Sequence, residues 1–357
     1  MTEVRPLVVA MDETVLEEIL RVAAVAGCEP ECAPDLAAAR ARWARAPLVV
    51  LDEAAVRAGP ELSRRGGVVL ICKGAPEGEA WRHAYNSGAG RIIALPDEEA
   101  ALAEAFADVL DGPADRAGRV IGVIGGSGGA GASVLAGAVA LAADEDPAGA
   151  LLVDCDPLGG GVDLLLGLEK AEGRRWPEVR LTGRVSLPAL IVDLPQHRHG
   201  GRGLPVLSCG REGPGPSAEA LDAVVAAGKR AGRTVVCDLP RGFGEQEAAV
   251  VADADLVVLV VPVESRACMA AKQVMRRLSA YTDRIGIVAC GRSPVGFTAQ
   301  ETAALLGPPL LAAMAPERGL AVSVENGEFR PRHRGPLAKA AEAVLTAARP
   351  ESGARQR

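Results

Sequence analysis

The chain has 357 residues, 49% of them hydrophobic, and a formal net charge of −7. This length accommodates two hydrophobic cores, and an aromatic content of only 3% means that aliphatic side chains fill them. The acidic balance argues against nonspecific binding of nucleic acid, and the first residues lack the basic and apolar pattern of a secretion signal. We therefore expect a cytoplasmic protein with two domains.

Residues 6–110 alternate between strand-like and helix-like segments. Apolar runs predict five strands, at residues 6–11, 28–33, 47–51, 67–72 and 91–95. Helical periodicity or a capping residue predicts helices at residues 13–26, 35–46 and 97–110. Five strands with intervening helices indicate an α/β domain with a flavodoxin-like parallel sheet over residues 1–110.

The layout of this first domain resembles a receiver domain, with Asp52 in the place of the phosphorylated aspartate. A receiver holds Mg²⁺ with two acids after its first strand, and here Met11 replaces one acid while Asp12 remains. Leu95 stands before Pro96, where a receiver has a lysine. Phosphoryl chemistry needs both the metal and the cation. We therefore interpret the domain as a pseudo-receiver and Asp52 as a vestigial phosphoacceptor or a turn residue at a strand end.

Turn-forming residues separate this domain from the rest of the chain. Residues 111–118 read DGPADRAG and predict a linker, and residues 119–348 form the expected second domain. Within it, residues 169–233 are hard to assign beyond a helix at 187–194 and several loops. Residues 349–357 read RPESGARQR and predict a disordered tail.

A glycine-rich loop opens the second domain. Residues 121–134 read IGVIGGSGGAGASV, between an apolar strand-like run and an apolar helix-like run. Such glycines let backbone N–H groups approach an anion at a helix N-terminus. A phosphate loop normally ends in Gly-Lys-Ser/Thr, but here Ala132 stands at the lysine position and Ser133 keeps the hydroxyl that reaches Mg²⁺. The predicted nucleotide cradle consists of Gly128, Gly129, Ala130, Gly131, Ala132 and Ser133. A glycine turn formed only for packing is the alternative.

Further motifs follow in order and carry a resemblance to a known family. A buried strand ends in Asp154-Cys155-Asp156, a second ends near Asp238, and residues 256–264 form a third apolar run. With the loop, this order resembles the MinD/ParA family of deviant phosphate-loop ATPases. The glycine-rich loop without lysine is similar to the CpaE/TadZ branch, and most of all to actinobacterial CpaE-like septum site-determining (Ssd) proteins. That branch carries a receiver-like domain in front of the ATPase-like domain.

The resemblance implies a mostly parallel sheet and a site for ATP or ADP with Mg²⁺. It implies that Asp156 orients the attacking water, that Ser133 ligates the metal, and that Asp238 supports the metal through water. The family uses two lysines on the phosphates, and Ala132 and Ser127 stand in their places. We therefore expect weak or absent hydrolysis, and whether ATP is hydrolysed at all stays open.

The resemblance also implies a role in positioning: regulation of cell division at the septum, or localisation of a Tad-type pilus or secretion apparatus. It implies a homodimer and a partner that is a secretion-type ATPase or an inner-membrane pilus or division component. Residues 337–348 have no basic face, so we expect no direct membrane insertion but recruitment to the pole or septum by a protein. We expect no specific nucleic acid. An active ParA-type ATPase that moves a cargo and a receiver-type signalling adaptor are the alternatives.

Overall fold

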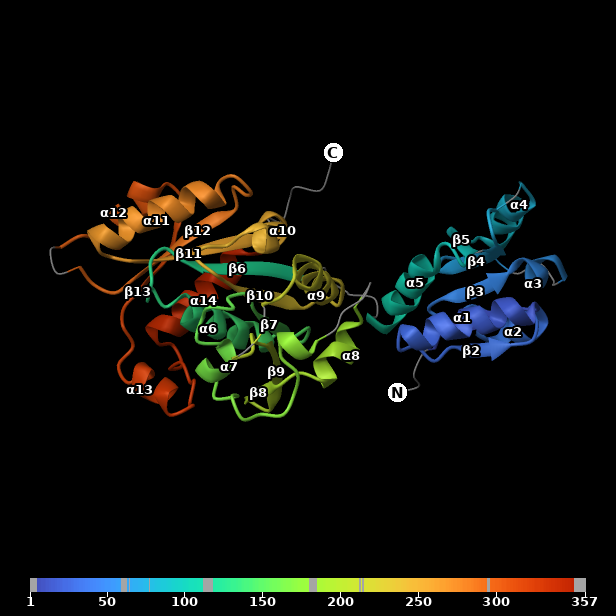
Figure 1. Cartoon of the computed structure of the whole chain (residues 1–357), viewed down its shortest axis with the longest axis horizontal. Coiled ribbons are helices and arrows are strands. Elements are labelled where there is room, and N and C mark those ends of the chain that lie inside the picture. The colour runs from blue at the N-terminus through green and yellow to red at the C-terminus, as the bar shows by residue number, and fades with distance from the viewer. Residues whose placement is uncertain are drawn as a thin grey trace. The chain divides into compact units, whose positions relative to one another are not determined.

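A computed structural model describes residues 5–58, 63, 65–76, 78–111, 118–179, 185–211, 213, 215–293 and 296–349. The chain divides near residue 113 into two compact units, each built around one β-sheet (Figure 1). Most of the predicted linker (residues 112–117) and of the predicted tail (residues 350–357) lies outside the described residues.

The first unit is a five-stranded parallel sheet in the order β2-β1-β3-β4-β5. Its elements are β1 (Leu7–Val9), α1 (Glu13–Val25), β2 (Glu31–Ala33), α2 (Leu36–Trp43), β3 (Val49–Asp52), α3 (Glu53–Ala58), β4 (Val68–Lys73), α4 (Gly78–Ser87), β5 (Arg91–Leu95) and α5 (Glu99–Asp111). This strand order is the flavodoxin-like one, and it confirms the predicted fold of this unit.

Helices cover both faces of this first sheet. Asp12 caps α1, because its Oδ1 accepts hydrogen bonds from the backbone N–H groups of Thr14 and Val15. Apolar residues at helical spacing then place one face of α1 against the sheet beside α5. The helices α2, α3 and α4 pack their apolar residues on the opposite face.

The second unit is an eight-stranded sheet in the order β13-β12-β11-β6-β10-β7-β9-β8, parallel except for β8. Its strands are β6 (Arg119–Gly125), β7 (Ala150–Asp154), β8 (Gln196–His199), β9 (Arg202–Leu207), β10 (Thr234–Leu239), β11 (Leu256–Pro262), β12 (Ile285–Cys290) and β13 (Leu310–Met314). Its helices are α6 (Ala132–Asp144), α7 (Val162–Leu165), α8 (Leu187–Val192), α9 (Ala218–Arg230), α10 (Glu245–Asp253), α11 (Ser265–Leu278), α12 (Ala299–Leu306), α13 (Leu320–Glu325) and α14 (Pro336–Ala347), with a 3₁₀ turn at Trp176–Glu178.

The helix that follows the glycine loop lies at the centre of this unit. Nearly all of α6 is buried, and α14 packs beside it on the same face of the sheet (Figure 1). The helices α9 to α12 cover the other face. The terminal helix α14 buries Leu337, Ala340 and Val344 and therefore packs in the core, as its sequence predicts. No helix among the described residues is both long and apolar enough to cross a membrane.

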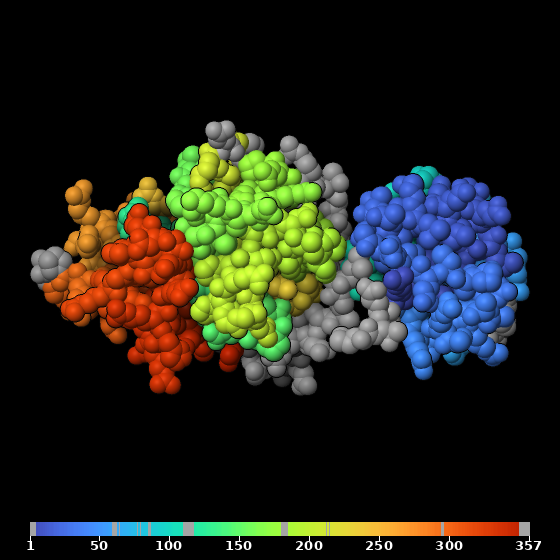
Figure 2. All heavy atoms as spheres, turned by 90° about the horizontal axis from the view of Figure 1, so that it is seen from below, coloured from blue at the N-terminus to red at the C-terminus, as the bar shows by residue number. Residues whose placement is uncertain are grey.

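Residues 169–233, for which the sequence predicts little regular structure, form one edge of the eight-stranded sheet. The predicted helix at residues 187–194 is α8, but β8 and β9 form a hairpin in which the polar stretch of His197 and His199 pairs with β9. In Figure 2 the segment that contains α13 (red) lies beside the region that contains β8 and β9 (light green). The backbones of Gly167 and Gly327 are in close contact.

Candidate functional site

The glycine loop between β6 and α6 exposes its backbone. Gly129 (φ 70°) and Gly131 (φ 83°) adopt the left-handed conformation that favours glycine. A Cβ built on Gly128, Gly129 or Gly131 would meet no atom within 4 Å. The N-terminus of α6 begins directly afterwards at Ala132, where the helix dipole favours negative charge. The loop therefore offers backbone N–H groups to an open space that an anion can fill.

Three residues singled out in the sequence line one cavity of about 270 Å³ beside this loop. They are Ser133, Asp156 and Asp238, and Asp154 and Glu325 also line it. Asp154 and Asp238 lie opposite each other on the paired strands β7 and β10. We call this cavity the acidic cavity, because the charged side chains that line it in the described part of the chain are all carboxylates.

Asp238 has the most perturbed acidity of these carboxylates. Its side chain is 5% exposed, and burial raises the pKa of Asp238 to about 7, with a further rise from Asp154 and Asp156. The Ser133 hydroxyl donates a hydrogen bond to the Asp238 carboxylate, which opposes that rise. Asp238 thus holds a proton much of the time near neutral pH, and a cation in the acidic cavity would favour its ionised form.

Asp154 also supports the surrounding loop. Its Oδ2 accepts hydrogen bonds from Ser208 Oγ (3.1 Å) and from the backbone N–H groups of Val162 and Cys209 (3.2 Å each). Trp176 Nε1 donates to the Asp154 carbonyl oxygen at 2.8 Å. Ser208, Cys209 and Trp176 come from the segment that the sequence left unassigned, so sequence patterns alone missed them.

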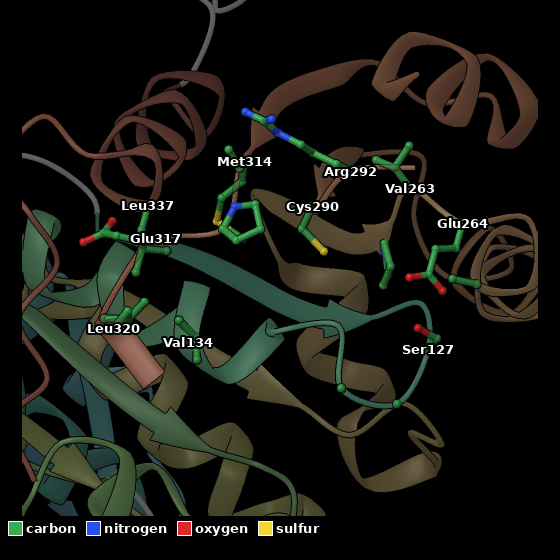
Figure 3. A pocket seen from close by; sticks show the side chains of 17 residues that line it. Ser127, Val134, Val263, Glu264, Cys290, Arg292, Met314, Glu317, Leu320 and Leu337 are labelled. Atoms are coloured by element: carbon green, nitrogen blue, oxygen red, sulfur yellow. The ribbon is translucent and has the colours of Figure 1, made fainter. Parts of the chain in front are cut away.

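A second, larger cavity of about 420 Å³ adjoins the same loop (Figure 3). Its polar lining side chains include Glu264, Arg292 and Glu317, and its apolar lining includes Val134, Val263, Met314, Leu320 and Leu337. Cys290, at the end of β12, donates a weak hydrogen bond from Sγ to the Ala130 carbonyl oxygen at 3.2 Å. This contact joins the wall of the larger cavity to the loop.

Glu317 leaves one hydrogen-bond acceptor unused in the larger cavity. Its Oε1 accepts from the backbone N–H of Arg332 at 2.7 Å. Its Oε2 is buried without a partner in the part of the chain that the structure describes. An unpaired buried carboxylate oxygen is costly, and this one lies against Gly335.

In the first unit, backbone groups occupy both oxygens of the buried Asp52. Oδ2 accepts from the N–H groups of Met11 and Asp12, each at 2.8 Å. Oδ1 accepts from the N–H of Ala55 at 2.7 Å, at the start of α3. Asp52 thus joins the first loop to the third helix, which agrees with the interpretation as a strand-end turn residue.

A lysine lies close to Asp12 of this first loop. Lys73, the last residue of β4, forms an ion pair from Nζ to Asp12 Oδ2 at 2.8 Å. This hydrogen bond lowers the pKa of Asp12. Leu95 stands where a receiver has its lysine, so this unit brings a cation to the acid from a different strand.

Comparisons with known proteins agree with this architecture. Residues 9–117 match the family described as Rv3660c-like, CheY-like N-terminal domain. The protein Rv3660c of Mycobacterium tuberculosis (strain H37Rv) is 43% identical over 311 residues, which cover 86% of this chain and 87% of that protein.

Two solved structures resemble the second unit in fold. The match to a ParA family ATPase from Chlorobium tepidum TLS has a TM-score of 0.54 at 16% identity. It covers 64% of this chain and 98% of the ATPase chain. The MinD cell division protein of Aquifex aeolicus has a TM-score of 0.53 at 20% identity, over 64% and 97% of the two chains. The predicted α/β fold class is therefore confirmed: a CheY-like domain precedes a MinD/ParA-like domain, and the chain belongs to the Rv3660c-like family.

Proposed function

We propose that this protein is a nucleotide-binding positioning protein of the CpaE-like, septum site-determining kind, with weak or absent hydrolysis. The observation that carries the proposal is the open glycine loop beside Ser133, Asp156 and Asp238, with Ala132 in place of the lysine. The loop can hold a nucleotide, but the site lacks the cation that phosphoryl transfer needs.

The residues at the loop fit ATP or ADP with Mg²⁺. The N–H groups of residues 128–133 would bind the phosphates, Ser133 would ligate the metal, and Asp238 would support it through water. Among the described residues, no group of three His, Cys, Asp or Glu side chains could hold a metal ion. Phosphate oxygens would thus complete the metal's coordination. The larger cavity would take the nucleoside.

The missing lysines lead us to expect slow turnover. Asp156 would orient a water molecule, but Ala132 and Ser127 cannot neutralise charge that develops on the phosphates. Loss of a transition-state cation costs ~10³-fold or more in rate, by analogy with arginine fingers. In our proposal the bound nucleotide therefore acts mainly as a structural or gating ligand.

Exposed apolar side chains near the acidic cavity support a homodimer across this face. Leu158, in the loop after Asp156, is 95% exposed, and Leu164 and Val322 are also exposed. Leu164 itself lines the cavity, and α13 carries Val322. A second copy of the chain would bury these side chains. In this proposal Leu158→Asp should prevent any nucleotide-dependent dimer, as measured by light scattering.

The positioning role rests on the family relation and the fold. The structure of Aquifex aeolicus MinD in a complex with MinC has a TM-score of 0.52 at 20% identity. We propose that this chain likewise binds a protein partner: a secretion-type ATPase, or an inner-membrane pilus or division component. That partner would recruit the cytoplasmic protein to the pole or septum, where it controls division or places a Tad-type apparatus.

Nucleotide titration and phosphate release test the chemistry. We expect weak binding of ATP and ADP that depends on Mg²⁺, and very slow release of phosphate. Fast turnover that Asp156→Ala abolishes would favour the active ParA-type ATPase instead. An absence of binding at millimolar ATP would mean that the loop is purely structural.

A fluorescent fusion tests the biological role. We expect polar or septal foci that disperse when the partner is deleted, and longer cells on overproduction if the protein controls septation. A uniform signal with normal cell length would contradict a positioning role. A Mg²⁺-dependent phosphoryl mass gain that Asp52→Asn abolishes would favour the receiver-type adaptor.

A further inference from the structure

Among the described residues, no positive side chain lines the acidic cavity to meet a phosphate. Its charged lining residues are Asp154, Asp156, Asp238 and Glu325. A nucleotide bound there brings further negative charge, and Ala132 leaves the usual lysine position neutral. Backbone N–H groups and Mg²⁺ offset part of this charge, but a side-chain cation close to the cavity would stabilise the complex further.

One arginine lies directly against the wall of the acidic cavity. Gly161 lines the cavity, and a Cβ built on Gly161 would collide with Nη1 of Arg211. Arg211 comes from the loop after β9, and its side chain is 49% exposed. The absence of a side chain at Gly161 (φ 85°) is what lets the guanidinium lie so close to the loop.

Asp163, the present partner of Arg211, also has other partners. Arg211 Nη2 binds Asp163 Oδ1 at 3.0 Å, and the backbone N–H of Leu164 donates to the same oxygen at 2.9 Å. The other oxygen, Oδ2, faces Arg175 Nε at 3.5 Å. Asp163 would therefore keep a cation and a hydrogen bond if Arg211 turned away.

Arg175 has a different environment and cannot make the same movement. Its Nη atoms donate to the carbonyl oxygens of Leu168 (2.8 Å), Ala171 (2.9 Å) and Gly173 (2.7 Å), and its side chain is 17% exposed. Of the two arginines on Asp163, Arg175 is fixed to the backbone, whereas Arg211 is half-exposed.

We propose that Arg211 is the phosphate-binding cation of this protein: it exchanges Asp163 for the terminal phosphate of a nucleotide bound at the glycine loop. The proposal rests on the nucleotide-binding function argued above. A guanidinium can bind two phosphate oxygens at once, so Arg211 would replace the missing lysine by a residue from the β9 loop. It also gives a function to a segment whose sequence carries no motif.

The test measures the affinity of the full-length protein for fluorescent ATP and ADP with Mg²⁺, and its thermal stability without nucleotide. We expect Arg211→Met to weaken ATP binding by about tenfold or more, the size of a lost charged hydrogen bond. Arg211→Lys should recover part of the affinity, and the melting temperature should stay close to that of the wild type. Arg175→Met, by contrast, should lower the melting temperature.

Two other arginines serve as matched controls, because they follow strands that end at the same edge of the sheet. Arg241 and Arg266 are exposed, and we expect their substitution by methionine to leave ATP affinity unchanged. Equal affinity of wild type and Arg211→Met, or a loss confined to the Arg241 or Arg266 variant, would overturn the proposal for Arg211. A wild-type protein that binds no nucleotide would instead overturn the proposed function itself.

Discussion

Asp238 shows how a single residue couples the acidic cavity to pH. Its pKa rises from the ordinary 3.8 to about 7 because it is buried near Asp154 and Asp156. A carboxyl group with a raised pKa binds its proton more tightly in the folded state than in the unfolded state. Its stabilising contribution is therefore complete below about pH 4 and is lost as pH rises through about 7. The loss amounts to about 4 kcal/mol at most.

Asp238→Asn should remove this pH dependence, because the amide carries no ionisable proton. In a chelator, the wild type should lose thermal stability relative to Asp238→Asn as pH rises from 5 to 8. Unfolding curves of both proteins at each pH measure the difference, and Asp222→Asn on the exposed side of α9 is the control. If the two stability profiles stay parallel, the burial of Asp238 does not govern its titration.

Asp52→Asn should destabilise the first unit rather than abolish a phosphorylation signal. The carboxylate accepts three backbone N–H groups, and an amide nitrogen can accept none of them. Each buried N–H left unpaired costs about 1–3 kcal/mol. Asp35→Asn is the matched control, since Asp35 caps α2 with one bond and asparagine caps helices well. A stable Asp52→Asn variant together with a phosphoryl gain in the wild type would contradict this expectation.

At the scale of elements, α13 depends on its flanks for its position. None of its own residues is buried, although Val324 and Glu325 line the acidic cavity. Beyond the helix, the Phe329 ring packs against Gly137 of α6, and Gly167 meets the backbone of Gly327; within it, Leu320 and Val324 pack against the core. The geometry of the cavity thus depends in part on two glycine contacts that lie outside it.

Gly167→Ala should loosen α13 and destabilise the protein. Gly167 has a φ of 69°, and a Cβ there would collide with the carbonyl oxygen of Gly327. The positive φ and the collision together should lower the free energy of unfolding by more than ~1 kcal/mol. Hydrogen exchange of α13 and the melting temperature measure the change. The control is Gly128→Ala, which faces open space: it should keep its stability but bind nucleotide more weakly. Unchanged exchange in α13 would show that the segment has other supports.

Local patterns explain which elements the sequence could predict. The strand β11 (Leu256–Pro262) is an uninterrupted apolar run because a parallel sheet buries it on both faces. The strand β8 reads QHRH at a sheet edge, so no apolar run announces it. In α13 the residues that pack against the core, Leu320 and Val324, stay partly exposed, so the amphipathic signal is weak. The glycine loop was recognisable because its conformation depends on closely spaced glycines.

The supports of the site lie too far apart in the sequence for any local pattern. Ser208 binds Asp154 across 54 residues, and Lys73 binds Asp12 across 61 residues. Ser133, Asp156 and Asp238 could be proposed because the order of their motifs resembles that of the MinD/ParA family. Arg211 could not, since a single arginine in an irregular loop has no distinguishing spacing.

At the scale of the whole molecule, we expect the two units to have separate tasks: docking for the first and nucleotide binding for the second. Trp81 on α4 is 61% exposed, which is unusual for so large an apolar side chain. Trp81→Glu should disperse the foci of a fluorescent fusion while nucleotide affinity stays at the wild-type value. The control is Val25→Glu, 74% exposed on α1 at the opposite face of the sheet. Dispersal by the control alone would place the docking surface on α1.

The ion pair between Lys73 and Asp12 has a consequence for how this protein can be regulated. A metal ion exchanges with the surrounding solution, so its occupancy follows the free concentration of that ion. The Lys73 ammonium is attached to the chain and remains near Asp12 at a fixed effective concentration. We therefore expect the first unit to bind its partner independently of the supply of magnesium. The concentrations of the protein and of its partners in the cell would then determine how much of the first unit is bound.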